Sequence, residues 1–406
     1  MTSLTDGTVL PAGWAWQTLK DVVEVDSNHL RPVVGSRYPI VGLENIESES
    51  GEIRQVPLVD EGSIGSVKYE FGENHILYGR LRPNLNKVAL PTFSGGCSTD
   101  ILVLRTRDHA VKEYVAFWLR SSDFRSYAVS RARGTKMPRL DRDAFLESPI
   151  PVAPEEEQRV IVSVLERAYE IVARRREALS LADAILPAAF FEMFGDPSTE
   201  KSRQGFETLG NLAEVRSGVT KGRRLEGRDL VEAPYLRVAN VQDGFLDLSE
   251  IKYITLLRGE MGKYELRAGD VLITEGGDPD KLGRGCIWRE EIEGCVYQNH
   301  IFRLRANRER LLPEYLAAVL RTPYARSYFL RSAKRSSNLA SINATQVRSF
   351  DVPLPPLRDQ RKFVSAVQQW NEVAERMKAG QNESEDLLHS LTHHAFAGRL
   401  EIASPA

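Results

Sequence analysis

The chain reads Ile150-Pro-Val-Ala-Pro-Glu-Glu-Glu-Gln-Arg159 near its middle and Val352-Pro-Leu-Pro-Pro-Leu-Arg-Asp-Gln-Arg361 further on. In each stretch, prolines are followed by acidic side chains and a Gln-Arg pair. Proline lacks an amide hydrogen and restrains its neighbour, so it ends regular structure, whereas acidic side chains favour the first turn of a helix. The two stretches therefore predict that a helix begins at the same place in two related halves.

The repeat extends over most of the chain. Trp16–Val25 resembles Phe206–Val215, Glu113-Tyr114 matches Glu314-Tyr315, and Ala189-Phe190 matches Ala395-Phe396. The matches keep their order and their spacing drifts slowly, which is typical of two homologous halves with small insertions. Each half has short β-like runs, then a helical stretch near 114–119 or 315–320, then a basic loop. This order predicts an α+β fold with an internal duplication.

A long amphipathic helix is predicted to follow the prolines of each half. From 155 to 186, apolar residues fall three and four positions apart on one stripe, and a similar stripe begins at Phe363. Gly380 and the polar residues up to Asp386 weaken the second stripe, so we expect fraying or a kink there. Each stripe needs a partner. We expect the two helices to pack on each other as a coiled coil, and the alternative is that each packs on its own half.

The sequence shows no arranged catalytic site. Phosphate-binding loops, dinucleotide fingerprints, HExxH and GxSxG are all missing. Residues 276–280 hold two aspartates among glycines but lack the ligand spacing of a calcium site. Three cysteines cannot make a disulfide framework, and neither a signal-peptide pattern nor a stretch of ~20 apolar residues is present, which favours a reducing cytoplasm.

Positive charge is clustered although the net charge is only −2. Basic residues recur in the same region of both halves, between the helical stretch and the prolines, and they include Arg120, Arg125, Arg321 and Arg326. Since Arg and Lys bind phosphates while Arg, Asn and Gln read bases, this recurrence favours a nucleic-acid surface over a merely solvated one. The candidate DNA-binding residues are Arg80, Arg82, Asn84, Asn86, Lys87, Arg131, Arg133, Thr135, Lys136, Arg139, Lys221, Arg223, Arg224, Arg331, Lys334, Arg335, Ser336 and Asn338.

These stretches resemble the specificity subunits of type I restriction–modification systems. The proline segments leading into Gln-Arg resemble the family's helix starts. Similar to the family's other motifs are Met193–Pro197, Leu77–Lys87, the loop Gly134–Leu140 and the tail Leu391–Leu400. The second half has Ser337–Asn343 in place of the loop Gly134–Leu140, at the position where the recognition domains of this family vary most.

The resemblance implies two target recognition domains separated by a pair of long antiparallel coiled-coil helices with pseudo-twofold symmetry. The implied divisions are 1–153 for the first domain, 154–195 for the central helix region, 196–355 for the second domain and 356–406 for the C-terminal helix region. It also implies a non-catalytic, cytoplasmic subunit that reads a bipartite asymmetric target in double-stranded DNA. Two modification subunits would bind S-adenosylmethionine, and two restriction subunits would use ATP and Mg²⁺.

Two other interpretations remain open from the residues alone. One is an enzyme fused from two related domains, such as a nuclease with unrecognised carboxylates. The other is a coiled-coil adaptor that binds proteins and not DNA. Cleavage or methylation by the chain alone would favour the first, and DNA binding that is insensitive to salt or undetectable would favour the second.

Overall fold

The computed structural model describes residues 9–182, 184–199, 205–223, 225, 229–277, 282–335 and 340–400. The chain forms two compact units, which we call unit 1 (Met1–Glu177 with Lys378–Ala406) and unit 2 (Ala178–Met377). The borders between the units fall inside two long helices, α5 (Glu155–Ala182) and α12 (Leu357–Phe396). The sequence-based divisions after residues 153, 195 and 355 coincide with helix ends, since they fall before α5, after α6 (Ile185–Phe194) and before α12. They therefore differ from the borders of the compact units, which fall within helices.

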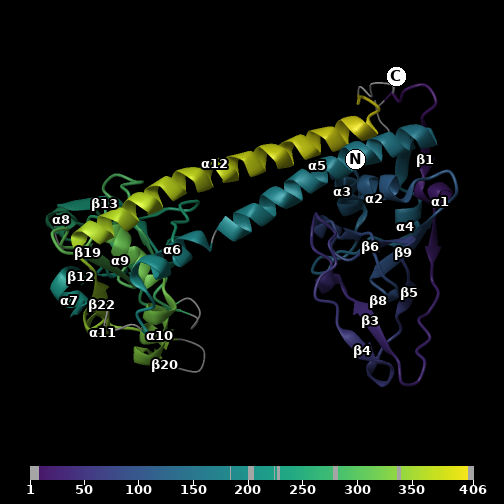
Figure 1. Cartoon of the computed structure of the whole chain (residues 1–406). Helices are drawn as coiled ribbons and strands as arrows, with labels where there is room; N and C mark the ends of the chain where they lie inside the picture. The colour runs from purple at the N-terminus through teal and green to yellow at the C-terminus, as the bar shows by residue number, and fades with distance from the viewer. Residues whose placement is uncertain are drawn as a thin grey trace. The chain divides into compact units, whose positions relative to one another are not determined.

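Unit 1 is built on two four-stranded sheets and a separate strand pair. The first sheet has the order β2-β9-β6-β7, the second β4-β3-β8-β5, and β1 pairs antiparallel with β10. Helices α2 and α3 are in the unit where the first sheet lies (Figure 1). The elements are β1 (Ala15–Thr18), α1 (Leu19–Val22), β2 (Val23–Asp26), β3 (Arg37–Val41), η1 (Leu43–Asn45), β4 (Leu58–Asp60), η2 (Glu61–Ser63), β5 (Tyr69–Phe71), β6 (His75–Gly79), η3 (Pro83–Leu85), β7 (Val88–Ala89), β8 (Gly95–Cys97), β9 (Ile101–Thr106), α2 (Lys112–Arg120), α3 (Ser122–Arg131), α4 (Arg142–Leu146) and β10 (Pro149–Val152).

Unit 2 repeats this framework. Its four-stranded sheet has the order β12-β19-β15-β17, and β11 pairs antiparallel with β22. The elements are β11 (Gly205–Thr208), α7 (Leu209–Leu212), β12 (Ala213–Ser217), β13 (Leu230–Leu236), η4 (Val238–Asn240), β14 (Lys252–Leu257), η5 (Arg258–Glu260), α8 (Met261–Tyr264), β15 (Val271–Thr274), β16 (Gly276–Gly277), β17 (Gly285–Ile287), β18 (Val296–Tyr297), β19 (Ile301–Ala306), α9 (Pro313–Leu320), α10 (Pro323–Ser332), β20 (Lys334–Arg335), β21 (Ala340–Ser341), α11 (Ala344–Arg348) and β22 (Asp351–Leu354). The predicted duplication is confirmed by the matching strand orders.

The glutamine of each Gln-Arg pair explains why the long helices begin where they do. Gln158 is fully buried; its side chain accepts from the Val111 amide (2.8 Å) and donates to the Ala153 carbonyl (2.8 Å). Gln360 is also fully buried and makes the same bonds with Leu312 (2.9 Å) and Pro355 (2.9 Å). Each glutamine therefore ties the proline segment and the helix start to the segment that leads into α2 or α9.

The long helices differ from prediction at two places. A continuous helix over 155–186 is wrong, because α5 ends at Ala182 and α6 starts at Ile185. Pro187 lies at the third position of α6. Proline lacks an amide hydrogen and is tolerated in a helix only near its start, so a new helix begins just before this residue. The fraying expected near Gly380 is also wrong, because α12 runs through this residue. The Ser384 hydroxyl donates to the Gly380 carbonyl (2.8 Å), and the Arg175 guanidinium donates to the same carbonyl.

Within unit 1, the first part of α5 and the last part of α12 lie side by side and antiparallel (Figure 1). Arg176 pairs with Glu385 (2.7 Å), while Ile161, near the start of α5, shares a core with Phe396 at the end of α12. Helix-on-helix packing is therefore confirmed for this unit. The alternative, in which each long helix packs on its own half, holds for one part of α5, because its first turns also pack on the core of their own half.

The end of each half's helical region packs on a tyrosine near the start of α2 or α9. In unit 1, the ring of Phe396 lies 5.0 Å from that of Tyr114, whose hydroxyl donates to the Pro151 carbonyl. In unit 2, Phe190 of α6 lies 5.8 Å from Tyr315, whose hydroxyl donates to the Pro353 carbonyl. None of the helices in the described residues is both long and apolar enough to cross a membrane.

Candidate nucleic-acid interface

Two loops that are far apart in the sequence meet beyond the end of β6 in unit 1. The Arg82 amide donates to the Pro138 carbonyl (2.7 Å), and the Leu140 amide donates to the Arg80 carbonyl (2.9 Å). Arg133 and Arg139 exchange both of their main-chain hydrogen bonds (3.0 and 2.9 Å), which closes the second loop as a hairpin. We call residues 80–86 and 131–140 together the loop pair of unit 1.

Cationic side chains dominate the exposed part of this loop pair. Arg82, Arg131, Arg133, Lys136 and Arg139 are all exposed, and so are the hydrogen-bonding side chains of Asn84 and Thr135. The Nε of Arg80 is buried and has no acceptor among the described residues. Such an arrangement suits a DNA backbone, which offers phosphate acceptors to Arg and Lys.

Two predicted DNA-binding residues have side chains that form hydrogen bonds within the protein. Asn86 is 4% exposed and donates its amide to the carboxylate of Glu49 (2.7 Å) and to the Arg120 carbonyl (2.8 Å). Lys87 donates to the Leu43 carbonyl (2.6 Å). These contacts shape the base of the loop. Asn86 is too buried to face a ligand, which corrects that expectation, whereas Lys87 is half-buried and its contact with DNA stays a prediction.

Other clustered arginines are paired within the protein as well. Arg125 forms an ion pair with Glu49, and Arg321 with Asp243 (3.2 Å). The guanidinium of Arg120 donates to the Val88 carbonyl and lies over the rings of Phe117 and Tyr169, and burial lowers its pKa. The cluster that the sequence presents as continuous is therefore divided into a structural part and a free part.

Unit 2 brings together the equivalent loops. Strand β21 pairs with both β16 and β20, and the Ile342 amide donates to the Glu275 carbonyl (2.9 Å). We call residues 275–277, 331–335 and 340–342 the loop pair of unit 2. Arg331 and Lys334 are exposed on it. Arg335 lies in β20, whereas Ser336 and Asn338 lie outside the described residues.

The third predicted cluster is weaker than it looks in the sequence. Lys221 is exposed, but Arg223 makes two bonds with the carboxylate of Glu260 (2.9 and 2.8 Å). This arginine holds the pKa of Glu260 below its ordinary value. Arg224 lies outside the described residues, so only Lys221 of this group is shown as an available cation.

Equivalent main-chain hydrogen bonds hold the two loop pairs in place. The Arg80 amide donates to the Asp100 carbonyl (3.0 Å), just as the Glu275 amide donates to the His300 carbonyl (2.9 Å). The sequence reasoning did not single out Asp100, Glu275 or His300. Superposition of the two halves would have identified them, because Arg80 and Glu275 directly follow β6 and β15, whereas Asp100 and His300 directly precede β9 and β19.

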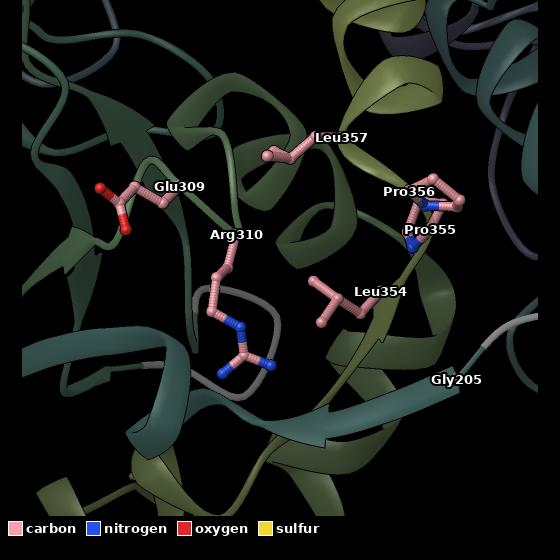
Figure 2. Close-up of a pocket in the computed structure, with 7 residues that line it drawn as sticks. All are labelled: Gly205, Glu309, Arg310, Leu354, Pro355, Pro356 and Leu357. Carbon is pink, nitrogen blue, oxygen red and sulfur yellow. The ribbon is translucent and has the colours of Figure 1, made fainter.

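An open hollow of about 500 Å³ in unit 2 offers no such set of functional groups (Figure 2). It is lined by Gly205, Leu354, Pro355, Pro356 and Leu357 together with Glu309 and Arg310. In Figure 2 the Glu309 carboxylate points away from Arg310, whose guanidinium pairs with Glu207 and keeps the pKa of that carboxyl low. The described residues also contain no group of three or more His, Cys, Asp or Glu that could hold a metal, and Asp278 and Asp280 of the glycine-aspartate loop lie outside them.

Comparison with known proteins gives this architecture a context. Residues 204–384 match the family model described as the type I restriction modification DNA specificity domain. The chain is 25% identical over 319 residues to the EcoKI specificity subunit of Escherichia coli K12, covering 73% of this chain and 68% of the relative. It is 25% identical over 316 residues to the StySPI specificity subunit of Salmonella potsdam, with coverage of 73% and 67%.

Solved structures of similar fold agree with the duplicated α+β architecture. A chain from a type I restriction–modification assembly matches with a TM-score of 0.65 at 20% identity, over 97% of this chain and 100% of that one. A type I S subunit from M. genitalium matches with a TM-score of 0.53 at 14% identity, over 97% and 98%. Two like units, each with exposed cations on its loop pair, make up the described part of the chain. The chain is therefore similar to the specificity subunits of type I restriction–modification systems, and its residues 204–384 match the DNA specificity domain of that family.

Proposed function

We propose that each unit reads one half of a bipartite, asymmetric DNA target through its loop pair. The observation that carries this proposal is the repeated main-chain framework, which presents exposed cations at the same place in both units. Cations at the rim bind phosphates and fix the register, while the side chains between them reach base edges. The chain itself is non-catalytic in this proposal.

The long helices are proposed to set the gap between the half-sites and to dock the methyltransferase subunits. In unit 1, Ile171 of α5 and Leu387 of α12 are 52% and 58% exposed. In unit 2, Leu181 and Met193 are 66% and 40% exposed. Large apolar side chains left on helix surfaces favour a protein partner.

The remaining partners follow from the family resemblance and are proposals too. Two modification subunits would bind S-adenosylmethionine and methylate adenine, and two restriction subunits would use ATP and Mg²⁺. Assembly would take place in the cytoplasm. No cofactor is proposed for this chain.

A domain exchange tests the reading of DNA by halves. Residues 16–150 would be replaced by the equivalent segment of another family member, and the chain would be produced with its methyltransferase partner. We expect sequencing of methylated DNA to show a new sequence in one half of the target and an unchanged sequence in the other. Simultaneous loss of both halves, in a complex that still assembles, would contradict independent reading.

Salt dependence and activity of the isolated chain test the two competing interpretations. DNA affinity of the reconstituted complex should fall linearly on a log–log plot against salt, because phosphate contacts release counterions. Affinity that does not change with salt would favour a protein adaptor. Cleavage or methylation of DNA by the pure chain with Mg²⁺ and S-adenosylmethionine would favour an enzyme.

A further inference from the structure

The two loop pairs share a backbone but carry opposite charges at one equivalent position. Arg80 and Glu275 each follow the inner strand of the sheet, and each accepts a main-chain bond at its carbonyl (2.9 Å in both units). Their amides donate to Asp100 and to His300, the residues just before β9 and β19. Superposition of these bonds therefore sets Arg80 against Glu275 and Asp100 against His300.

The neighbouring strand position differs in the same sense. In unit 1, Arg139 pairs with Leu81, and its guanidinium forms an ion pair with Asp100 (2.5 Å). In unit 2, Ser341 takes the equivalent place opposite Gly276. The carboxylate of unit 1 thus has an arginine of its own loop pair as its partner, whereas Glu275 lies beside the imidazole of His300, with Nδ1 2.6 Å from Oε2.

A carboxylate at this place works against simple DNA affinity. Phosphates repel it, so electrostatics alone would favour a cation there, as in unit 1. The Glu275 side chain is nonetheless 30% exposed and within reach of a ligand, and His300 holds one of its oxygens in place. An ionised carboxylate only accepts hydrogen bonds, and in the major groove the donors are the exocyclic amino groups of cytosine (N4) and adenine (N6).

We propose that Glu275 is a specificity-determining residue of unit 2 that accepts a hydrogen bond from the exocyclic amino group of one base in its half-site. The inference rests on the proposed function and deepens it. The bases excluded at that position are guanine and thymine, whose major-groove acceptors face a carboxylate unfavourably. His300 is a positioning residue, because it acts on the DNA only through the orientation of Glu275.

The test uses the full chain with its methyltransferase partner. Binding of duplexes that differ at single positions of the methylated target would be compared for the parent complex and for Glu275→Ala and Glu275→Gln. We expect Glu275→Ala to lose about 10- to 100-fold of discrimination at one position of the unit 2 half-site, since a good base contact contributes ~1–3 kcal/mol. The unit 1 half-site should be read as before.

Glu275→Gln separates the two possible amino groups. Glutamine makes a bidentate contact with N6 and N7 on the major-groove edge of adenine, so an adenine at the position would keep its preference, whereas a cytosine would lose it. The Gln variant has nearly the shape of the parent side chain and guards against a folding defect in the Ala variant. Unchanged discrimination in both variants at every position of that half-site would overturn the inference.

Glu309→Ala is the matched control. Glu309 is exposed and lies beyond the other end of β19, a strand that ends ~20 Å from His300 at ~3.3 Å per residue. It removes the same charge from unit 2 and should leave base discrimination unchanged; an equal loss in this control would contradict the proposal. A parent complex that methylates no bipartite target would instead contradict the proposed function itself.

Discussion

At the scale of single residues, the two buried glutamines contribute most clearly to both fold and repeat. Each satisfies a backbone amide and a backbone carbonyl that would otherwise be left unpaired inside the protein. Backbone groups that are buried without partners cost ~1–3 kcal/mol each. The Gln-Arg pair that the sequence repeats is therefore explained by its first member, since Arg159 is exposed and its ion pair is with Glu155 in its own helix.

We expect Gln158→Ala to lower the free energy of unfolding by ~2–4 kcal/mol, because the Val111 amide and the Ala153 carbonyl lose their partner. Urea denaturation of the full chain measures it. Arg159→Ala is the control and should change stability by less than ~1 kcal/mol, as is usual for an exposed ion pair. Equal effects of the two substitutions would show that the buried bonds are not what stabilises the helix start.

The three thiols provide a prediction about pH. Burial raises the pKa of Cys97, Cys286 and Cys295 to about 12, from an ordinary value of 9.0. The folded chain keeps these protons while the unfolded chain releases them, so the thiols' contribution to stability should be constant below pH 9 and be lost as the pH rises from 9 toward 12. Urea midpoints measured between pH 8 and pH 10.5 test this.

A chain with all three cysteines replaced by alanine is the control for that experiment. Its midpoint should decline less steeply above pH 9, since the raised tyrosine pKa values, such as that of Tyr114, remain. Under native conditions at pH 8, the three thiols should react with alkylating reagents far more slowly than free cysteine. Rapid native labelling would show that they are not buried.

At the scale of elements, the end of α12 anchors unit 1. Phe396 is 2% exposed and lies against Tyr114 and Trp118 of α2 (5.0 and 5.2 Å between ring centroids). We expect Phe396→Ala to cost ~3–5 kcal/mol locally, which hydrogen exchange should report as faster exchange in α2 and unchanged exchange in α9. Leu387→Ala, at a position 58% exposed, should leave both unchanged. Protection of α2 that survives Phe396→Ala would mean that α12 does not stabilise it.

How much of these elements the sequence predicts depends on the range of the interactions. The starts of α5 and α12 follow from prolines and acidic residues within a few positions, and the repeat locates both. The α12 helix continues through Gly380, whose carbonyl accepts from Arg175, a residue distant in sequence, so local propensity alone predicts the wrong result. The break before α6 had a local cause in Pro187, which the apolar stripe concealed.

The candidate site was predictable only in part for a similar reason. Charge clustering located the loops, and the exposed cations of 131–139 lie in one of them. Composition cannot distinguish an exposed arginine from one such as Arg120, which is stacked on aromatic rings and hydrogen-bonded. Nor can it distinguish an exposed asparagine from Asn86, which is buried and bonded to Glu49. Those assignments require partners that only the folded chain brings together.

At the scale of the whole molecule, we expect matched insertions in the two helices to change the gap in the DNA target. Ion pairing of Arg176 with Glu385 fixes the helix register in unit 1, so four residues would be added after Glu177 and four before Lys378. Four residues lengthen a helix by ~6 Å, or about two base pairs at ~3.4 Å each. Sequencing of methylated DNA should show a longer gap between unchanged half-sites.

The control for these insertions is Arg174→Ala, which removes only the pair with Glu170 in the same helix (2.5 Å) and should leave the gap as it was. Insertions that alter the half-sites while the gap stays constant would refute the spacer role. A lengthened gap would also separate the helices' contribution from that of the loop pairs.

The main-chain bonds beneath each loop pair have a consequence for evolution. Amides and carbonyls hold Arg80 and Glu275 in place, and every residue type except proline supplies both groups. If these side chains read bases as proposed, a single codon change at such a position would alter the accepted DNA sequence while the main-chain framework stays intact. A lineage could then diversify the DNA sequences that its proteins recognise without first having to evolve a new fold.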